Sequence, residues 1–225
     1  MILLKPDLHV LHDGVLEGRR TFGNIMKYIM MGTSSNFGNM FSMAGAALFL
    51  PFLPMLPTQI LLNNILYDVS EIAIPLDKVD AVDIHAPRVL DMNFVRNFML
   101  VIGPISSLFD FLTFYVMWSV LHADEKLFQT GWFVESLCTQ VLVIFVIRTR
   151  GNPLKSRTHP LLVASSLVVV VGAVLLPFTP IGSYFGFVAP PAVFYLILGA
   201  MVAVYLLVVE LAKRGFYRWA AGRPH

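Results

Sequence analysis

Six apolar stretches alternate with short polar segments along the chain. They cover residues 22–50, 58–74, 94–121, 128–147, 161–176 and 190–211. Most of them approach or exceed the ~20 residues that a helix needs to cross the hydrocarbon core of a bilayer. The pattern therefore predicts an all-α membrane protein, built as a bundle of six transmembrane helices.

Proline and glycine mark the breaks in this pattern. Pro51, Pro54 and Pro57 stand between the first two stretches, where they prevent one continuous helix and predict a short turn. Gly103-Pro104 lies inside the third stretch and predicts a kink.

The composition supports the membrane class. Of the 225 residues, 57% are hydrophobic and 13% are charged, whereas a soluble domain carries about 25% charged residues. The single cysteine, Cys138, excludes a disulfide or thiolate cluster within one chain. The first residues, MILLKPDLHV, lack the basic segment and cleavage site of a signal peptide. We expect the lipid bilayer, and no nucleic acid, as the surrounding partner.

The distribution of Lys and Arg predicts the orientation. With six spans, all of the 16 Lys and Arg residues except Lys126 fall on one side of the membrane. Positive residues are enriched on the cytoplasmic side. Both termini are therefore predicted to be cytoplasmic.

The second stretch carries polar residues on one helical face. Asn64, Asp68 and Glu71 are spaced i, i+4 and i+7, so they lie on one side of a helix. A carboxylate at the centre of a bilayer costs about 2.5–3.5 kcal/mol on the lenient insertion scale. Two acids and an amide therefore need a polar or positive partner, and we interpret this face as one wall of a cation site.

The first stretch supplies further oxygen ligands. Asn36 and Asn39 lie in a segment rich in Gly and Ser, and together with the second stretch they give carboxylate and amide oxygens without His or Cys. Such a set suits hard cations, namely magnesium, calcium, sodium or potassium, and composition does not choose among them. The alternatives remain open: the asparagines could join helices by hydrogen bonds, and Glu71 could be solvated at the membrane edge.

Two further acids have more than one interpretation. Asp110 lies in the middle of the third span and either pairs with a serine or helix end or serves the ion. Glu135, in the fourth span, either completes the ion site or stays near the outer surface.

Motifs for energy conversion are absent from the sequence. It contains no G-x-x-x-x-G-K-[ST] phosphate loop, no dinucleotide fingerprint and no Ser/His/Asp arrangement at a water-facing site. The chain by itself thus has no predicted catalytic residues.

Four segments resemble a known family. They are DGVLEGRRTFGNIMKYI (13–29), SSNFGNMF (34–41), LPFLPMLPTQILLNNILYDVSEIAIP (50–75) and FMLVIGPISSLFDFLTFYVMW (98–118). These segments look like the C-terminal membrane half of bacterial magnesium-translocating P-type ATPases, and the resemblance covers essentially the whole chain.

The resemblance implies an ATP-driven cycle. In that family an aspartate of a DKTGT motif is phosphorylated and magnesium moves across the bacterial inner membrane into the cytoplasm. This sequence has no DKTGT. We therefore interpret it as a fragment: residues 1–21 as a remnant of the phosphorylation domain and stalk, 22–215 as the transport domain, and 216–225 as a basic cytoplasmic tail. ATP would act only through the missing domains.

The resemblance also implies roles for individual residues. By similarity to calcium pumps of the same superfamily, Asn36, Asn39, Asn64, Tyr67 and Asp68 fall on ion-ligating positions. Two of these positions depart from the calcium pattern, because Asn39 replaces a carboxylate and Tyr67 replaces a threonine, which favours one partly hydrated divalent ion. The alternative is a stand-alone carrier or channel, or a membrane module that pairs with a separately encoded N-terminal part of the pump.

Overall fold

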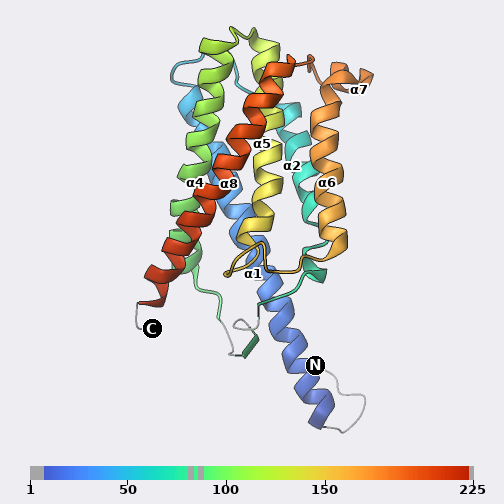
Figure 1. The fold of residues 1–225 in the computed structure, drawn as a ribbon, viewed down its shortest axis with the longest axis vertical. Coiled ribbons are helices and arrows are strands. Elements are labelled where there is room, and N and C mark those ends of the chain that lie inside the picture. Colours follow the sequence, from blue (N-terminus) through green and yellow to red (C-terminus); the bar gives the residue numbers. More distant parts are fainter. Residues whose placement is uncertain (1–7, 81–83, 86–88, 223–225) are drawn as a thin grey trace.

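The computed structural model describes residues 8–80, 84–85 and 89–222, and the regular elements in these ranges are all helical (Figure 1). In chain order they are α1 (Leu8–Ala46), α2 (Pro57–Glu71), the 3-10 turn η1 (Ile74–Leu76), α4 (Met92–Tyr115), the π-helical turn η2 (Val116–Val120), α5 (Glu125–Ile147), α6 (Pro160–Leu175), the 3-10 turn η3 (Leu176–Phe178), α7 (Pro180–Tyr184) and α8 (Ala192–Ala221).

Six helices, α1, α2, α4, α5, α6 and α8, overlap the six apolar stretches, one helix to each stretch. Within the described residues, four segments are long and apolar enough to cross a membrane: Met92–Val120, Glu125–Ile147, Pro160–Phe178 and Ala192–Ala220. Helix α2 has only 15 residues, and α1 is rich in polar residues. The described part of the fold is thus all-helical with four candidate membrane-spanning helices. Of the six predicted spans, those at α1 and α2 are not among these four.

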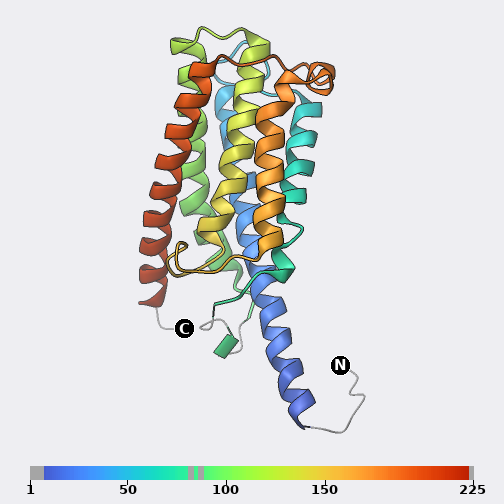
Figure 2. The same ribbon diagram turned by 45° about the vertical axis from the view of Figure 1, so that its right-hand side comes forward.

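The helices run alternately up and down, and α5 occupies the middle of the bundle (Figures 1 and 2). Most residues of α5 are buried, from Phe128 to Ile147. A helix that is buried on all sides is expected to be apolar on all sides. Helix α5 departs from this at Gln129, Glu135 and Gln140, which are buried polar residues. The first turns of α1 project beyond the bundle, at the same end as the last turns of α8 (Figure 2).

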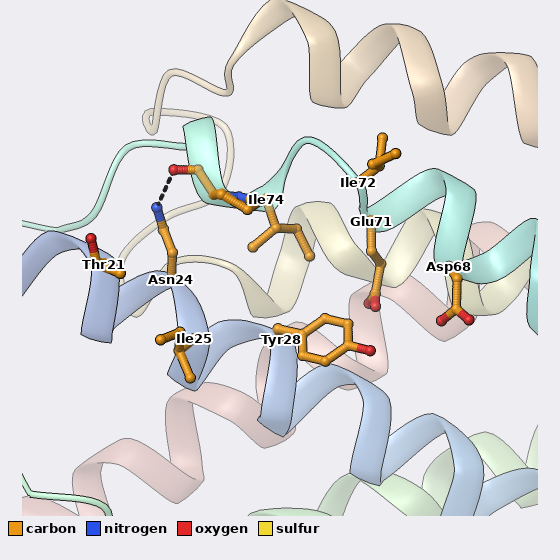
Figure 3. A pocket seen from close by; sticks show the side chains of 9 residues that line it. Thr21, Asn24, Ile25, Tyr28, Asp68, Glu71, Ile72 and Ile74 are labelled. Carbon is orange, nitrogen blue, oxygen red and sulfur yellow. Dashed lines mark hydrogen bonds between the residues drawn. The ribbon is translucent and has the colours of Figure 1, made fainter.

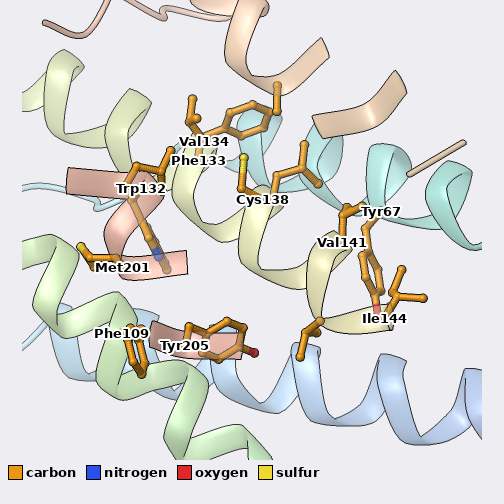
Figure 4. Packing of buried hydrophobic residues seen from close by; sticks show 14 of the residues in the cluster. Tyr67, Phe109, Trp132, Phe133, Val134, Cys138, Val141, Ile144, Met201 and Tyr205 are labelled. Atoms are coloured by element: carbon orange, nitrogen blue, oxygen red, sulfur yellow. The ribbon is translucent and has the colours of Figure 1, made fainter. Parts of the chain in front are cut away.

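Aromatic side chains fill the core around α5. Trp132 packs edge-on against Phe114 of α4, with 4.9 Å between ring centroids. Phe109 of α4 packs edge-on against Tyr205 of α8, at 5.2 Å (Figure 4). These contacts join three helices.

Small residues allow α1 and α4 to approach closely. A Cβ atom on Gly103 of α4 would lie 2.5 Å from the Phe37 ring of α1. The Ser107 hydroxyl donates a hydrogen bond to the Gly38 carbonyl at 2.9 Å. Such small-residue contacts with interhelical hydrogen bonds are typical of membrane helices. Helix α4 continues through Pro104, which stands one residue after this contact.

Helix ends follow local sequence signals. Pro57 occupies the first turn of α2, where its missing N–H has no cost. Asp91 and Asp124 accept hydrogen bonds from backbone N–H groups at the starts of α4 and α5. These signals fix where α2, α4 and α5 begin, and α2 packs against α5 and α6.

Candidate cation site

The predicted polar face of α2 divides between solvent-accessible and buried positions. Asn64 and Asp68 are exposed on the surface of the chain, whereas Glu71 at the end of the helix is only 3% exposed. Both carboxyl groups nevertheless line one pocket. Their helical spacing predicts that these two acids lie together, and both line this pocket.

This pocket lies between residues 21–28 of α1, the part of the helix predicted to be near the cytoplasm, and the end of α2. Its volume is about 370 Å³. Figure 3 shows Asp68 and Glu71 on the α2 side, with Tyr28 of α1 across from them. The residues that line it are Thr21, Asn24, Ile25, Tyr28, Asp68, Glu71, Ile72, Ile74 and Pro75.

Glu71 is buried without a hydrogen-bond partner. In the described part of the chain neither of its carboxyl oxygens accepts a hydrogen bond of ordinary geometry. The Tyr67 hydroxyl lies near this carboxyl, and it accepts a 3.4 Å hydrogen bond from Ser35 of α1. A buried polar group without a partner is costly and is rare in native proteins. A cation or a proton would satisfy the Glu71 oxygens.

Asn24 and Tyr28 belong to this pocket, and sequence reasoning missed both. The Asn24 amide donates to the carbonyl oxygens of Pro75 at 3.0 Å and Asp77 at 3.1 Å, which closes one end of the pocket. The signal in the sequence is their spacing: Thr21, Asn24 and Tyr28 are three and four residues apart and share a face of α1.

The two predicted ligands of α1 lie outside the pocket lining. Asn36 is exposed. Asn39 is half-buried, and its Oδ1 accepts a 3.3 Å hydrogen bond from Ser136 of α5, which in turn accepts from Gln140 at 2.5 Å. Asn39 is thus directed toward α5. Of the five predicted residues, the structure brings Asp68 and Glu71 to this pocket, whereas Asn36, Asn39 and Asn64 do not line it.

Within the described residues, no cluster of three or more His, Cys, Asp or Glu side chains is arranged to hold a metal ion. Two carboxylates with neighbouring amides and hydroxyls leave several positions on an ion free. Water or another segment would have to fill these positions, as is usual for Mg²⁺.

Asp110 and Glu135 lie apart from this pocket, in the core. They are 2% and 1% exposed, and Asp110 accepts hydrogen bonds from Ser42 and Trp132. A serine partner, one of the two interpretations of Asp110, is present in the structure. Glu135 is enclosed within the bundle, and its role stays a prediction.

An all-helical chain with four candidate membrane-spanning helices is a multi-pass membrane protein. The family model described as "Cation transporting ATPase, C-terminus" matches residues 52–215. The chain belongs to this family.

Curated relatives agree with the family match. The chain is 48% identical over 223 residues to "Magnesium-transporting ATPase, P-type 1" of Escherichia coli K12, covering 96% of this chain and 25% of that protein. Proteins of the same name from Salmonella typhimurium LT2 are 49% identical over 222 residues and 44% identical over 223 residues. Each of these alignments covers 96% of this chain and 24% of the relative. The chain thus spans about a quarter of the length of these relatives. The resemblance to the C-terminal half of a magnesium P-type ATPase is confirmed.

Proposed function

We propose that this chain is the membrane transport domain of a P-type ATPase that imports magnesium, driven by ATP hydrolysis in domains that these 225 residues do not contain. Three relatives named as magnesium-transporting ATPases support magnesium as the transported ion. The absence of a DKTGT motif from the sequence supports the assignment of ATP hydrolysis to other domains.

One observation carries the proposal: Glu71 is a buried carboxylate that has no cation partner and no hydrogen bond of ordinary geometry among the described residues, in a pocket that Asp68 also lines. A magnesium ion that keeps part of its water shell would neutralise both acids. Asn64, Asn39 and Asn36 would add neutral oxygen ligands as α1 and α2 move during transport.

Exposed polar side chains on α1 and α2 indicate that another protein segment packs against this face of the bundle. Asn36, Asn64 and Asp68 are exposed, although their helices lie within the membrane bundle. An acid that faces hydrocarbon costs several kcal/mol, about 2.5–3.5 on the lenient insertion scale. We propose that a segment outside this chain, either the rest of the same pump or a separately encoded N-terminal part, covers this face and completes the cation site.

The topology follows from the same proposal. Helices α1 and α2 would cross the bacterial inner membrane with the four apolar helices, because they pack within the same bundle (Figure 1). The start of α1 and the end of α8 lie at one end of the bundle, together with the basic α5–α6 loop, which we assign to the cytoplasm. Residues 1–21 would form the stalk toward the phosphorylation domain, 22–215 the transport domain and 216–225 a basic tail.

Magnesium uptake by a full-length relative tests the site. Substitutions equivalent to Asp68→Asn and Glu71→Gln remove charge but keep shape, and each should abolish uptake into cells that depend on the pump. The matched control is Glu17→Gln, on the exposed start of α1. Unchanged uptake in both pocket variants would refute the site.

The purified chain tests the division of labour. Reconstituted into liposomes, it should neither release phosphate from ATP nor conduct magnesium. Magnesium flux without ATP would instead support the stand-alone carrier or channel, and magnesium-dependent phosphate release would contradict the assignment of ATP hydrolysis to other domains.

A further inference from the structure

Two acids face each other in the middle of the bundle. Asp110 of α4 and Glu135 of α5 are 2% and 1% exposed, and their carboxyl groups lie within hydrogen-bonding reach of each other. Neither lines the pocket between α1 and α2. Their pairing therefore needs an explanation separate from the candidate cation site.

Both oxygens of Asp110 already accept hydrogen bonds from neutral donors. Ser42 of α1 donates to Oδ2 at 2.5 Å, and the Trp132 indole N–H of α5 donates to Oδ1 at 2.9 Å. The indole N–H is a donor only, so the Oδ1 of Asp110 must be its acceptor. This arrangement suits an ionised carboxylate at Asp110.

Glu135 has the opposite environment. Its Oε2 is buried and accepts no hydrogen bond of ordinary geometry from the described residues, and the Thr139 hydroxyl beside it donates to the backbone carbonyls of Glu135 and Ser136. Among the described residues, no Lys, Arg or His side chain interacts electrostatically with either acid. The other titratable groups beside the pair are Tyr205 of α8 and Cys138 of α5. Apart from the Thr139 hydroxyl, nothing among the described residues stabilises a second negative charge there.

Two ionised carboxylates have no hydrogen to share, so a hydrogen bond between them requires one proton. Two like charges in contact also cannot both persist in a buried site. Because Asp110 holds the donors, the proton belongs on Glu135.

We propose that Asp110 and Glu135 form a proton-binding site, in which Glu135 carries the proton and donates it to the Asp110 carboxylate. The ligand of this site is a proton and not a metal ion, and the pair keeps one negative charge in total.

The proton would hold three helices together beside the predicted cation ligands. Ser42, which bonds Asp110, lies three residues after Asn39 on α1. Asn39 in turn accepts from Ser136, the neighbour of Glu135. The pair therefore fixes α1 against α4 and α5 at the level of Asn39, and loss of the proton would weaken this contact.

Infrared spectroscopy of the purified chain in lipid nanodiscs tests the proposal. At neutral pH we expect the carbonyl band of a protonated carboxylic acid, shifting on transfer to D₂O. The band should be lost in Glu135→Gln and retained in Asp110→Asn, where a lone buried Glu135 keeps its proton. Spectra are recorded in a Glu71→Gln background, so that the other buried glutamate does not contribute. The exposed Glu125→Gln, on the same helix, is the matched control and should leave the band unchanged.

Isotope labelling gives the same answer without altering the pair. Carbon-13 in the glutamate carboxyl groups should move the band, and carbon-13 in the aspartates should not. Absence of the band, its movement with labelled aspartate, or its loss on addition of magnesium chloride would each overturn the proposal.

Discussion

Lys27 of α1 and Asp77, which follows η1, form a buried ion pair between residues 50 positions apart in the sequence. The Lys27 Nζ lies 2.9 Å from the Asp77 Oδ2, and their side chains are 9% and 0% exposed. Lys27 also donates to the carbonyl oxygen of Lys78 at 2.7 Å. The segment after α2 is thereby fixed to α1 next to the candidate cation pocket.

The same carboxylate serves a second cation. The Arg148 guanidinium, at the end of α5, donates to Oδ1 at 3.1 Å and to Oδ2 at 3.0 Å, and the His159 backbone N–H donates to Oδ1 at 3.2 Å. Asp77 therefore neutralises two buried cations and joins α1, α5 and the start of α6.

Asp77→Asn should strongly destabilise the chain. The amide leaves Lys27 and Arg148 without a negative partner, and removal of one member of a buried ion pair costs about 3–5 kcal/mol. The free energy of unfolding, measured with denaturant on the purified chain in detergent micelles, should fall by that amount.

Glu17→Gln provides the control, because Glu17 pairs with Arg20 at 3.1 Å on the exposed start of α1. An exposed ion pair contributes about 0–1 kcal/mol. Equal losses for the two substitutions would contradict the view that burial makes the Asp77 contacts important.

The stability of the chain should fall in acid because of Asp77. Burial by itself raises the pKa of Asp77, but the hydrogen bond and charge of Lys27, the charge of Arg148 and the His159 N–H outweigh it and hold the pKa below its ordinary value. A carboxyl with a lower pKa in the folded state adds stability above its unfolded pKa, about 3.9, and that stability is lost as pH falls through the folded pKa. Denaturation midpoints measured from neutral pH to below about pH 4 should show this loss. If the denaturation midpoint of Asp77→Asn falls as steeply in acid, the loss of stability must come from other carboxyl groups.

Gly103→Ala should separate α1 from α4. The new Cβ would lie 2.5 Å from the Phe37 ring, so one side chain or helix must shift, and overpacking of this kind typically costs about 1–3 kcal/mol. Gly199→Ala in α8 is the matched control, since nothing lies within 4 Å of its Cβ. Alanine favours a helix by up to about 1 kcal/mol over glycine, so this control should be neutral or stabilising. Thermal unfolding of both variants measures the difference, and equal shifts would contradict the close contact.

The helices could be predicted from the sequence because lipid imposes long apolar stretches. Their ends could not, since a helix continues wherever the backbone is helical, whether or not the residues are apolar. The chain is already helical at Leu8, well before the apolar stretch at 22, and α8 ends at Ala221 instead of 211. Apolar length reports the membrane core and not the full helix.

The candidate site could be predicted only in part. Helical periodicity placed Asp68 and Glu71 together, but it did not show that Glu71 is covered while Asp68 is open. Whether a side chain is buried depends on neighbouring elements that the spacing within one helix does not reveal. The turn η1 packs against α1 near Glu71, whereas no described element buries Asn64 and Asp68. The pairing of Asp110 with Glu135 crosses between helices, and no pattern within one span encodes it.

Asn63 and Asn64 offer the last prediction, because these neighbours on α2 have opposite surroundings. Asn63 is 2% exposed, and its Oδ1 has no hydrogen-bond partner among the described residues. Asn64 is exposed on the face proposed to meet the ion. The same change, Asn→Leu, should therefore act differently at the two positions.

Asn63→Leu should leave the unfolding free energy unchanged or raise it, since an apolar group of similar shape replaces an amide whose buried Oδ1 is unsatisfied. Asn64→Leu should also leave stability within about 0.5 kcal/mol. In the full-length relative, however, the substitution equivalent to Asn64→Leu should weaken magnesium transport by about tenfold or more, at least the loss seen for outer partners of metal ligands. Asn63→Leu should keep transport. Transport affinity and denaturation measured on both variants separate the two roles, and a transport defect confined to Asn63→Leu would place the ion path on the other side of α2.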